Sequence, residues 1–405
     1  MTTPIILDEL DRNGRVVPLA APVAAALSET GLVEVRPELR GEWRILPAGK
    51  VGAVRIDDVQ VQVVPKSRIG LNKLLFLLGY ARDPGFRPEN VSGVAEPDLW
   101  AALAESLARL AERATGGGVL QGYVTVEDSL RTVRGRIRIG DQIARRPGFL
   151  VPVEVTFDEF TVDIAENRIL RTAIRRMLAV PRLADAPAAR LAHLDGRLAE
   201  VSVLRRGAPI PVWHPSRLNE RYVPALRLAE LVLAHSSAEA GDGTVQVAGF
   251  VVDMAKVFED FVGTALTESL RRFPGTTVLQ YPDHLDQPTP GSKPGIPMYV
   301  DVVHTVNRRP RLVFDAKYKA ESPGGRYPNA DHYQMLAYAT ALAVPTAWLV
   351  YAGGGQPHSR AIRNTGIQVV EYPLNLRAEP VELLAQVDGL AERAWTEAGL
   401  VQSVA

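Results

Sequence analysis

The segments MYVDVVH (Met298–His304) and RLVFDAKYK (Arg311–Lys319) decide the fold expected for the C-terminal part of this 405-residue chain. Alternation and β-branched residues predict a strand over Met298–Thr305, and Arg311–Lys317 is typical of a second strand. Asn307–Pro310, which lies between them, has the composition of a turn. The sequence therefore predicts two neighbouring antiparallel strands.

Three charged residues are expected to meet on these strands. Side chains two positions apart on a strand share a face, so Asp315 and Lys317 point the same way, while Phe314 and Ala316 face the core behind them. Asp301 on the first strand comes within reach of both. A buried lysine beside two carboxylates is an unusual structural choice, because each charge loses solvation unless it is paired or metal-bound.

This set of side chains is suited to phosphodiester hydrolysis. Mg²⁺ prefers oxygen ligands and takes only one or two protein carboxylates. We therefore expect Asp301, Asp315 and the backbone carbonyl of Ala316 to bind Mg²⁺, for which Mn²⁺ can substitute. The metal would lower the pKa of a bound water, and Lys317 would orient or activate that water and stabilise the transition state. The sequence predicts a magnesium-dependent nuclease.

The D-x-K triplet also has a simpler explanation, an exposed hairpin with a weak Asp–Lys surface ion pair. On the triplet alone this is the better interpretation, because the pattern is common. Two flanking segments favour the nuclease. Asp331–Tyr338 (DHYQMLAY) is helical by composition and places Gln334 and Tyr338 on one face. Ala255–Arg272 is an amphipathic helix with Glu259 near its start.

In the order helix-Glu, strand-Asp, strand-Asp-x-Lys and helix-Gln-x-x-x-Tyr, the chain resembles the PD-(D/E)XK nuclease superfamily. The resemblance implies catalytic roles for Asp301, Asp315, Lys317, Gln334, Tyr338 and Glu259. The two aspartates match the metal-binding acids, the lysine matches the catalytic lysine, and the glutamine and tyrosine match an accessory helix motif. The glutamate matches an acid that many members carry in their first helix. With the strand Ala347–Tyr351, an αβββαβ core is implied.

Within that superfamily the chain is similar to the McrC family, the nuclease subunits of McrBC 5-methylcytosine restriction systems. The similarity begins near residue 70 and is carried by LNKLLFLLGYA (Leu71–Ala81), RGRI (Arg134–Ile137), TFDEFTVDIAENRIL (Thr156–Leu170), LNERY (Leu218–Tyr222), FEDFV (Phe258–Val262), DAKYK (Asp315–Lys319) and YQMLAY (Tyr333–Tyr338). It implies an endonuclease subunit that cleaves double-stranded DNA carrying modified bases. It also implies a partner, an McrB-like AAA+ GTPase hexamer, whose hydrolysis this chain stimulates.

Composition limits the alternatives. Lys+Arg and Asp+Glu both number 46, which argues against a stand-alone nonspecific DNA binder but suits a subunit that a partner delivers to DNA. The absence of cysteine excludes disulfides and thiol catalysis. No G-x-x-x-x-G-K-[ST] motif occurs, so we expect this chain to bind no nucleotide. The seven histidines lack zinc-site spacing.

The sequence also bears on location. The first residues, MTTPIILDELDRNG, do not form a signal peptide. No apolar run reaches the ~18 residues that a membrane span requires. We expect a cytoplasmic protein that does not contact a membrane.

We predict an α+β multidomain fold with three parts. Residues 1–67 form a β-rich N-terminal module that contacts DNA, contacts the partner or only acts as a scaffold. Residues 68–245 form a mainly helical middle domain with a β-hairpin finger near 119–139. Residues 246–405 form the PD-(D/E)XK α/β nuclease domain.

The predicted finger carries a basic strand face that consists of Arg131, Arg134, Arg136 and Arg138. Docking on a partner ranks first among three interpretations, because a finger of McrC-like proteins inserts into the McrB ring. A solvated face balanced by Glu127 and Asp128 ranks second. Contact with the DNA backbone ranks third.

Two other functions stay open. One is a motor-independent PD-(D/E)XK nuclease of DNA repair or recombination. The other is a non-catalytic regulatory subunit with a vestigial nuclease fold, against which the intact acids and lysine argue.

Overall fold

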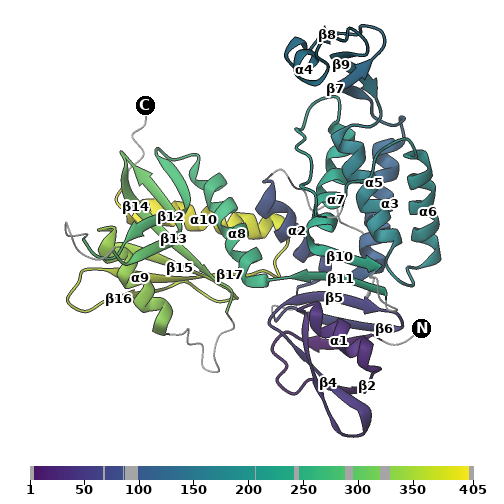
Figure 1. Cartoon of the computed structure of the whole chain (residues 1–405). Coiled ribbons are helices and arrows are strands. Elements are labelled where there is room, and N and C mark those ends of the chain that lie inside the picture. The colour runs from purple at the N-terminus through teal and green to yellow at the C-terminus, as the bar shows by residue number, and fades with distance from the viewer. Residues whose placement is uncertain are drawn as a thin grey trace. The chain divides into compact units, whose positions relative to one another are not determined.

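The computed structural model describes residues 4–66, 69–84, 86, 99–205, 207–240, 246–287, 295–319 and 329–400. The mixed α+β class expected from the sequence is confirmed (Figure 1). The chain divides into two compact units: unit 1 is Met1–Gly93 with Ala240–Ala405, and unit 2 is Val94–Glu239. The division into segments 1–67, 68–245 and 246–405 stays a prediction. Within the described ranges, no helix is both long enough and apolar enough to cross a membrane.

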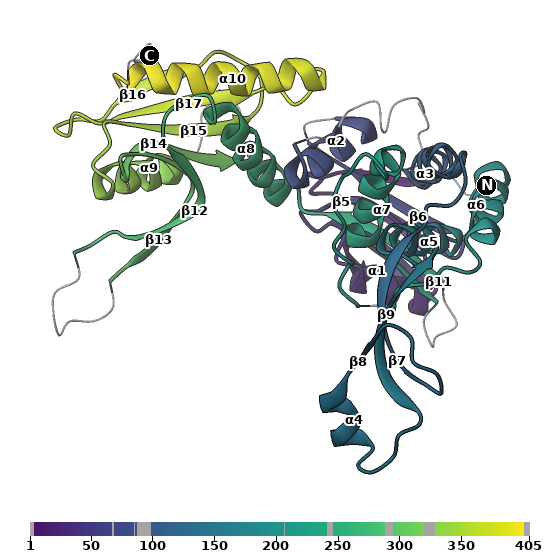
Figure 2. The ribbon, with the colours of Figure 1, turned by 90° about the horizontal axis from the view of Figure 1, so that it is seen from above.

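A six-stranded mixed sheet forms one part of unit 1. Its strands, in spatial order, are β12 (Thr276–His284), β13 (Pro297–Val306), β14 (Arg309–Lys317), β15 (Thr346–Ala352), β17 (Gln368–Leu374) and β16 (His358–Ala361). β12, β13 and β14 are antiparallel neighbours, whereas β14, β15 and β17 run parallel. Figure 2 shows α8 (Met254–Leu270) and α10 (Pro380–Glu397) on one face of the sheet and α9 (Asn329–Ala341) on the other. The predicted succession αβββαβ is observed as α8, β12, β13, β14, α9 and β15.

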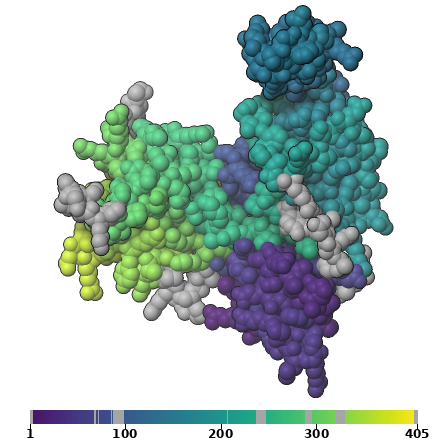
Figure 3. Space-filling view, in the orientation of Figure 1, coloured from purple at the N-terminus to yellow at the C-terminus, as the bar shows by residue number. Residues whose placement is uncertain are grey.

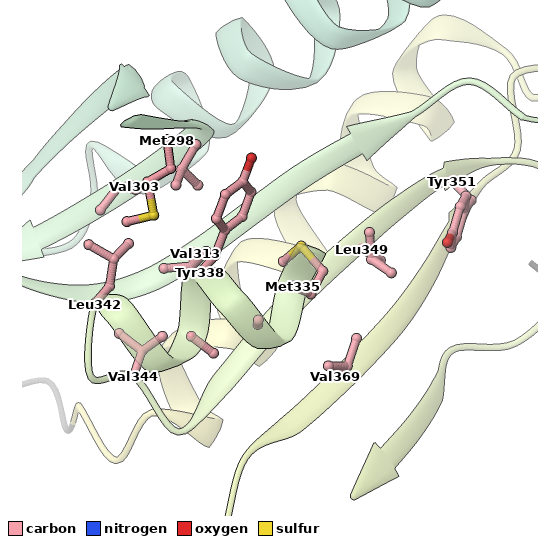
Figure 4. Close-up of a cluster of buried hydrophobic side chains, with 13 residues drawn as sticks. Met298, Val303, Val313, Met335, Tyr338, Leu342, Val344, Leu349, Tyr351 and Val369 are labelled. Carbon is pink, nitrogen blue, oxygen red and sulfur yellow. The ribbon is translucent and has the colours of Figure 1, made fainter. Parts of the chain in front are cut away.

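An apolar cluster fixes α9 on this sheet (Figure 4). Met335 of α9 packs with Val313, Leu349 and Val369, which come from the three parallel strands. Because side chains alternate along a strand, Asp315 lies on the same face of β14 as Val313. The core that anchors α9 therefore continues directly into the charged end of β14.

Two smaller sheets account for the N-terminal strands of unit 1. The five-stranded sheet has the order β1 (Ile5–Asp8), β6 (Val59–Val64), β5 (Val51–Ile56), β11 (Gln246–Val252) and β10 (Ser236–Ala240), and the three-stranded sheet has the order β2 (Arg15–Pro18), β4 (Glu42–Pro47) and β3 (Val33–Pro37). The predicted β-rich character is seen, but α1 (Ala21–Glu29) and the short 3-10 helix Leu39–Gly41 were not predicted. β5 pairs along its whole length with β11, so segments far apart in the sequence share one sheet.

Helix α2 (Leu71–Arg82) packs on α8. Rings of Phe76 and Tyr80 lie 6.0 and 5.6 Å from the ring of Phe261. The hydroxyl of Thr264 in α8 donates to the carbonyl of Ala81 at 2.9 Å. These contacts fix α8, the helix that carries Glu259.

Unit 2 combines helices with a small projecting sheet. The helices are α3 (Leu99–Thr115), α5 (Ala165–Leu178), α6 (Asp185–Arg197), α7 (Val223–His235) and the 3-10 helix Glu220–Tyr222. The projection, here called the finger, comprises β7 (Gly122–Leu130), β8 (Arg136–Ile137), α4 (Ile139–Arg145) and β9 (Val153–Thr161). In the space-filling view the finger stands out from the helices of unit 2 (Figure 3).

The predicted hairpin near 119–139 is wrong in its extent. β7 pairs with β9 over all nine of its residues, and β8 pairs with the opposite edge of β9, so the order is β7-β9-β8. The finger therefore extends to Thr161. Periodicity identified β7 but could not identify its partner, because that partner follows a further strand and a helix.

A single side chain closes the neck of the finger. The amide of Asn167 donates to the carbonyls of Leu120 and Val162 at 2.8 and 2.7 Å, just before β7 and just after β9. The N–H of Leu120 donates to the hydroxyl of Tyr222 at 2.9 Å. The segment around Asn167 therefore holds the two sides of the neck together.

The N-cap of α8 yields a stability prediction. The carboxylate of Asp253 accepts from the N–H groups of Ala255 and Lys256 at 2.9 and 3.3 Å. Asp253→Ala should lower the free energy of unfolding by about 1 kcal/mol, because an N-cap bond is lost. Urea titration of the purified chain measures the loss. Asp253→Ser keeps an acceptor and should retain most of the stability, so equal losses in both variants would contradict the capping role.

Candidate active site

β14 places Asp315 and Lys317 side by side on the face that packs against α9. Asp315 is only 1% exposed, and its Oδ2 lies 2.6 Å from the Nζ of Lys317. The shared face predicted for this pair is confirmed. The alternative of an exposed hairpin with a surface ion pair is wrong, because the carboxylate is fully buried.

Asp301 joins the pair through the backbone of β14. Its Oδ2 accepts from the N–H of Ala316 at 2.9 Å, and its Oδ1 accepts from the Nε2 of Gln280 at 3.1 Å. Val302 of β13 pairs with Phe314 of β14. One residue earlier on β13, the carboxylate of Asp301 accepts the N–H of Ala316 on β14. The carboxylate is thereby held against the backbone between Asp315 and Lys317.

Burial determines the electrostatics of this group. The pKa of Asp315 is raised to about 7, first by burial and then by the charge of Asp301, while Lys317 acts in the opposite direction. Burial lowers the pKa of Lys317, but Asp315 and Asp301 outweigh that effect, so the net shift is upward. The ammonium group therefore keeps its proton, and the buried carboxyl releases its proton only near neutrality.

The oxygens of Asp315 are suited to binding a cation. Apart from the ion pair with Lys317, neither oxygen has a hydrogen-bond partner among the described residues. Buried polar atoms are nearly always hydrogen-bonded, so a buried carboxylate with so few hydrogen bonds is suited to binding a cation. In the described parts of the chain, no group of three or more acidic or histidine side chains is arranged to hold a metal. Two carboxylates are what Mg²⁺ usually takes from a protein. The carbonyl of Ala316 as a further ligand stays a prediction.

Two more residues extend the site towards α8. The Oε1 of Glu259 accepts from the Nε2 of Gln280 at 2.6 Å and lies 3.4 Å from the Nζ of Lys256. Burial, followed by the charge of Asp301, raises the pKa of Glu259. Sequence reasoning found Glu259 but missed Gln280, because a neutral glutamine inside a strand matches no catalytic pattern.

Gln334 and Tyr338 connect α9 to β13. The amide of Gln334 donates to the hydroxyl of Tyr338 at 2.6 Å, and that hydroxyl donates to the carbonyl of Tyr299 at 2.9 Å. Burial raises the pKa of Tyr338, although the bond from Gln334 acts in the opposite direction. The predicted face is confirmed, and these contacts position β13 two residues before Asp301.

A second buried acid beside the site was also missed. Asp331 is 3% exposed, and its carboxylate lies 2.6 Å from the Nζ of Lys319 and accepts from the hydroxyl of Tyr351 at 3.3 Å. Its charge adds a small upward contribution to the pKa of Asp315. The position of Lys319, two residues beyond Lys317 and just after the end of β14, was the available signal.

The two histidines near the site have structural partners. His304 is buried and hydrogen-bonded to Thr277 at 2.9 Å. The Nε2 of His332 lies 2.6 Å from the Oε1 of the buried Glu371. α9 directs His332 towards Glu371, a buried acid of β17.

The finger does not present one basic strand face as predicted. The loop before β8 contains Arg131 and Arg134, and only Arg136 lies in that strand. The guanidinium of Arg134 sits 4.1 Å from the ring centroid of Phe157. Arg138 is paired with Glu127 at 2.5 Å, and it also meets Asp141 and Glu154. The expected balancing by Glu127 is thus seen for one arginine.

Comparisons with known proteins add a family and a fold. The model of the family described as McrBC 5-methylcytosine restriction system component matches residues 47–352, more than half of the chain. A structure of Thermococcus gammatolerans McrB AAA+ hexamers with bound McrC, a refined half-complex from a tetradecameric assembly, contains a similar chain. The likeness covers 98% of this chain and 100% of that chain at 18% identity, with a TM-score of 0.58, and shows a shared fold.

A chain in the cryo-EM structure of the Thermococcus gammatolerans McrBC complex is 22% identical, with a TM-score of 0.37. That alignment covers 61% of this chain and 73% of the other. A search of curated proteins gave no significant match.

Proposed function

Because the chain belongs to the family of McrBC 5-methylcytosine restriction system components, we propose that it is the DNA-cleaving subunit of such a system. The resemblance to the McrC family is confirmed by the family match. The observation that carries the proposal is the meeting of Asp301, Asp315 and Lys317 at one end of β14. Their order within the α8 to β15 succession supports a PD-(D/E)XK type of nuclease.

Each residue of the site has a role in phosphodiester hydrolysis. Asp301 and Asp315 would hold Mg²⁺, which when bound supplies a water of lowered pKa and neutralises charge on the phosphate. The raised pKa of Lys317 keeps its ammonium charged, so this group orients the water and stabilises the transition state electrostatically. The N–H of Ala316 fixes the direction of the Asp301 carboxylate. Glu259 adds a third acid at the edge of the site.

We further propose that the finger docks on an McrB-like AAA+ hexamer. The fold is shared with a chain from a complex of McrB hexamers with bound McrC. Large apolar side chains of the finger are exposed, among them Val133, Ile139, Ile143, Phe149, Leu150 and Val151. Several large exposed apolar side chains on one projecting element are typical of a protein interface. Arg131 and Arg136 add charge beside them. The partner would recognise the modified base and bring double-stranded DNA to this chain.

Substitution of Asp315 or of Lys317 should impair DNA cleavage but leave activation of the partner intact. Asp315→Asn and Lys317→Ala should each reduce cleavage of methylated DNA by at least about 10²-fold, because each removes a preorganised charge at the phosphate. Stimulation of the GTPase of the partner should stay at the level of the unmodified chain. Cleavage and nucleotide hydrolysis are measured in the assembled complex, with the exposed Lys50→Ala as control.

Cutting retained by either variant would reject the site. Cutting by the unmodified chain without partner would favour a motor-independent nuclease instead. Failure of Mg²⁺ or Mn²⁺ to support any cutting would favour a regulatory subunit.

The finger should be required for partner activation alone. Phe149 and Leu150 are 71% and 88% exposed, so the double change Phe149→Ala, Leu150→Ala should leave the fold intact. It should remove most of the GTPase stimulation, because docked apolar anchors carry much of an interface's binding energy. Nucleotide hydrolysis by the partner is titrated with each variant, and Leu39→Ala, which is 84% exposed in unit 1, is the matched control. Undiminished stimulation would exclude this surface as the docking site.

Metal affinity should depend on pH. Asp315 must lose its proton to bind Mg²⁺, and its pKa is raised to about 7, so affinity should be full above that pH and fall below it. The decrease should approach tenfold for each pH unit, since one proton is displaced. Lys317→Met should move the dependence to higher pH, because the ammonium lowers the pKa of Asp315. Calorimetric titration with Mg²⁺ at several pH values tests this, and a flat profile would contradict it.

A further inference from the structure

We propose that Gln280 is a positioning residue that holds Glu259 against Asp301, so that cation binding at this site depends on a neutral amide of β12. This inference rests on the proposed function and deepens it. Gln280 lies outside the Asp, Asp-x-Lys and Gln-x-x-x-Tyr pattern of the sequence. Its role follows from contacts, backbone conformation and charge.

The amide of Gln280 bridges two carboxylates from different elements. Its Nε2 lies 2.6 Å from the Oε1 of Glu259 on α8 and 3.1 Å from the Oδ1 of Asp301 on β13. An amide nitrogen carries two hydrogens, so it can donate to both acids at once. Asp301 Oδ2 is occupied by the N–H of Ala316, which leaves Oδ1 as the oxygen that the amide directs. One side chain therefore sets the separation of the two acids.

The backbone at Gln280 is held in a costly conformation. Its φ is +48°, in the left-handed region, although it lies inside a strand and is not a glycine. The neighbouring residues pair regularly, Leu279 with Val302 and Tyr281 with Val300, so the distortion falls opposite Asp301. Such conformations cost about 1–3 kcal/mol and persist where surrounding contacts enforce them, often at functional sites. Here the surrounding contacts are the regular strand pairs on either side and the two hydrogen bonds of the amide.

The neutrality of the amide is what a cation site requires. Glu259 and Asp301 repel each other, and a lysine or arginine in place of Gln280 would neutralise the charge that attracts Mg²⁺. Lys256 competes from the outer side of α8, where its Nζ lies 3.4 Å from Glu259 and 2.9 Å from Asp260. Among the described residues, Lys256 is the side chain other than Gln280 that pairs with Glu259. Gln280 thus keeps the glutamate directed at the site.

Four substitutions at position 280 distinguish the contribution of the side-chain amide from that of the backbone conformation. Gln280→Gly removes the side chain and adopts positive φ without strain, whereas Gln280→Ala loses the amide and keeps the strain. Gln280→Asn keeps a shorter amide in a residue that tolerates this conformation. Gln280→Glu has the same shape but replaces the donor by an acid. Gln368→Ala, an exposed glutamine on β17 of the same sheet, is the matched control.

Mg²⁺ affinity is measured in two ways: by calorimetry on the chain alone, and as the concentration that gives half-maximal cleavage in the assembled complex. Gln280→Gly and Gln280→Ala should each weaken Mg²⁺ binding about tenfold or more, as is typical when a residue that orients a metal ligand is lost. The KM for DNA and the stimulation of the partner GTPase should not change. At saturating Mg²⁺, most of the cleavage rate should return.

The double variant Glu259→Gln, Gln280→Gly should bind Mg²⁺ no more weakly than Glu259→Gln alone, because the amide acts through the glutamate. Unchanged Mg²⁺ affinity in Gln280→Gly, or additive losses in the double variant, would overturn the inference. An unmodified chain that binds Mg²⁺ but cuts nothing would overturn the proposed function, while the calorimetric comparison would still decide the role of Gln280.

Discussion

The buried ion pair between Asp315 and Lys317 is the constraint on which the rest of this structure depends. A carboxylate that is 1% exposed cannot be charged at low cost, and burial is the main reason that its pKa rises to about 7. Pairing with Lys317 at 2.6 Å reduces that cost. Breaking a buried pair by removal of one partner is strongly unfavourable, so β14 has to keep both groups on one face. The α9 cluster around Val313 holds that face in place.

The charged pair acquires a function only through elements that are distant in the sequence. β13 contributes Asp301, β12 contributes Gln280 and α8 contributes Glu259, and hydrogen bonds at 2.6–3.1 Å join them in series. Tyr338 of α9 ties the backbone of β13 two residues before its aspartate. Both layers of helices therefore contribute to the position of one carboxylate. A small displacement of any layer would change the proposed cation site before it changed the fold.

Local periodicity was sufficient to predict the pieces of this site but not its connections. Alternation and β-branching located the strands, and spacing put Asp315 beside Lys317 and Gln334 beside Tyr338. The pairing of β7 with β9 and of β5 with β11 joins segments far apart in the chain, and such pairing leaves no local pattern. Gln280 was missed for the same reason, since its role arises only from the register of β12 on β13.

Two of the segments that carry the family resemblance lie outside the site and stabilise the neck of the finger. TFDEFTVDIAENRIL and LNERY meet at the neck of the finger, where Asn167 binds Leu120 and Val162, and Asn219 donates to Glu166 at 2.9 Å. Many of the arginines in unit 2 are engaged with acids of the same unit. Arg190, for example, bridges Glu105 and Glu112 of α3, and Arg138 meets three acids within the finger. Charges engaged in this way contribute little to DNA affinity. The proposed nuclease site on β14, a finger stiffened at its neck and a balanced net charge together agree with the proposal of a subunit that cuts DNA presented to it by another protein.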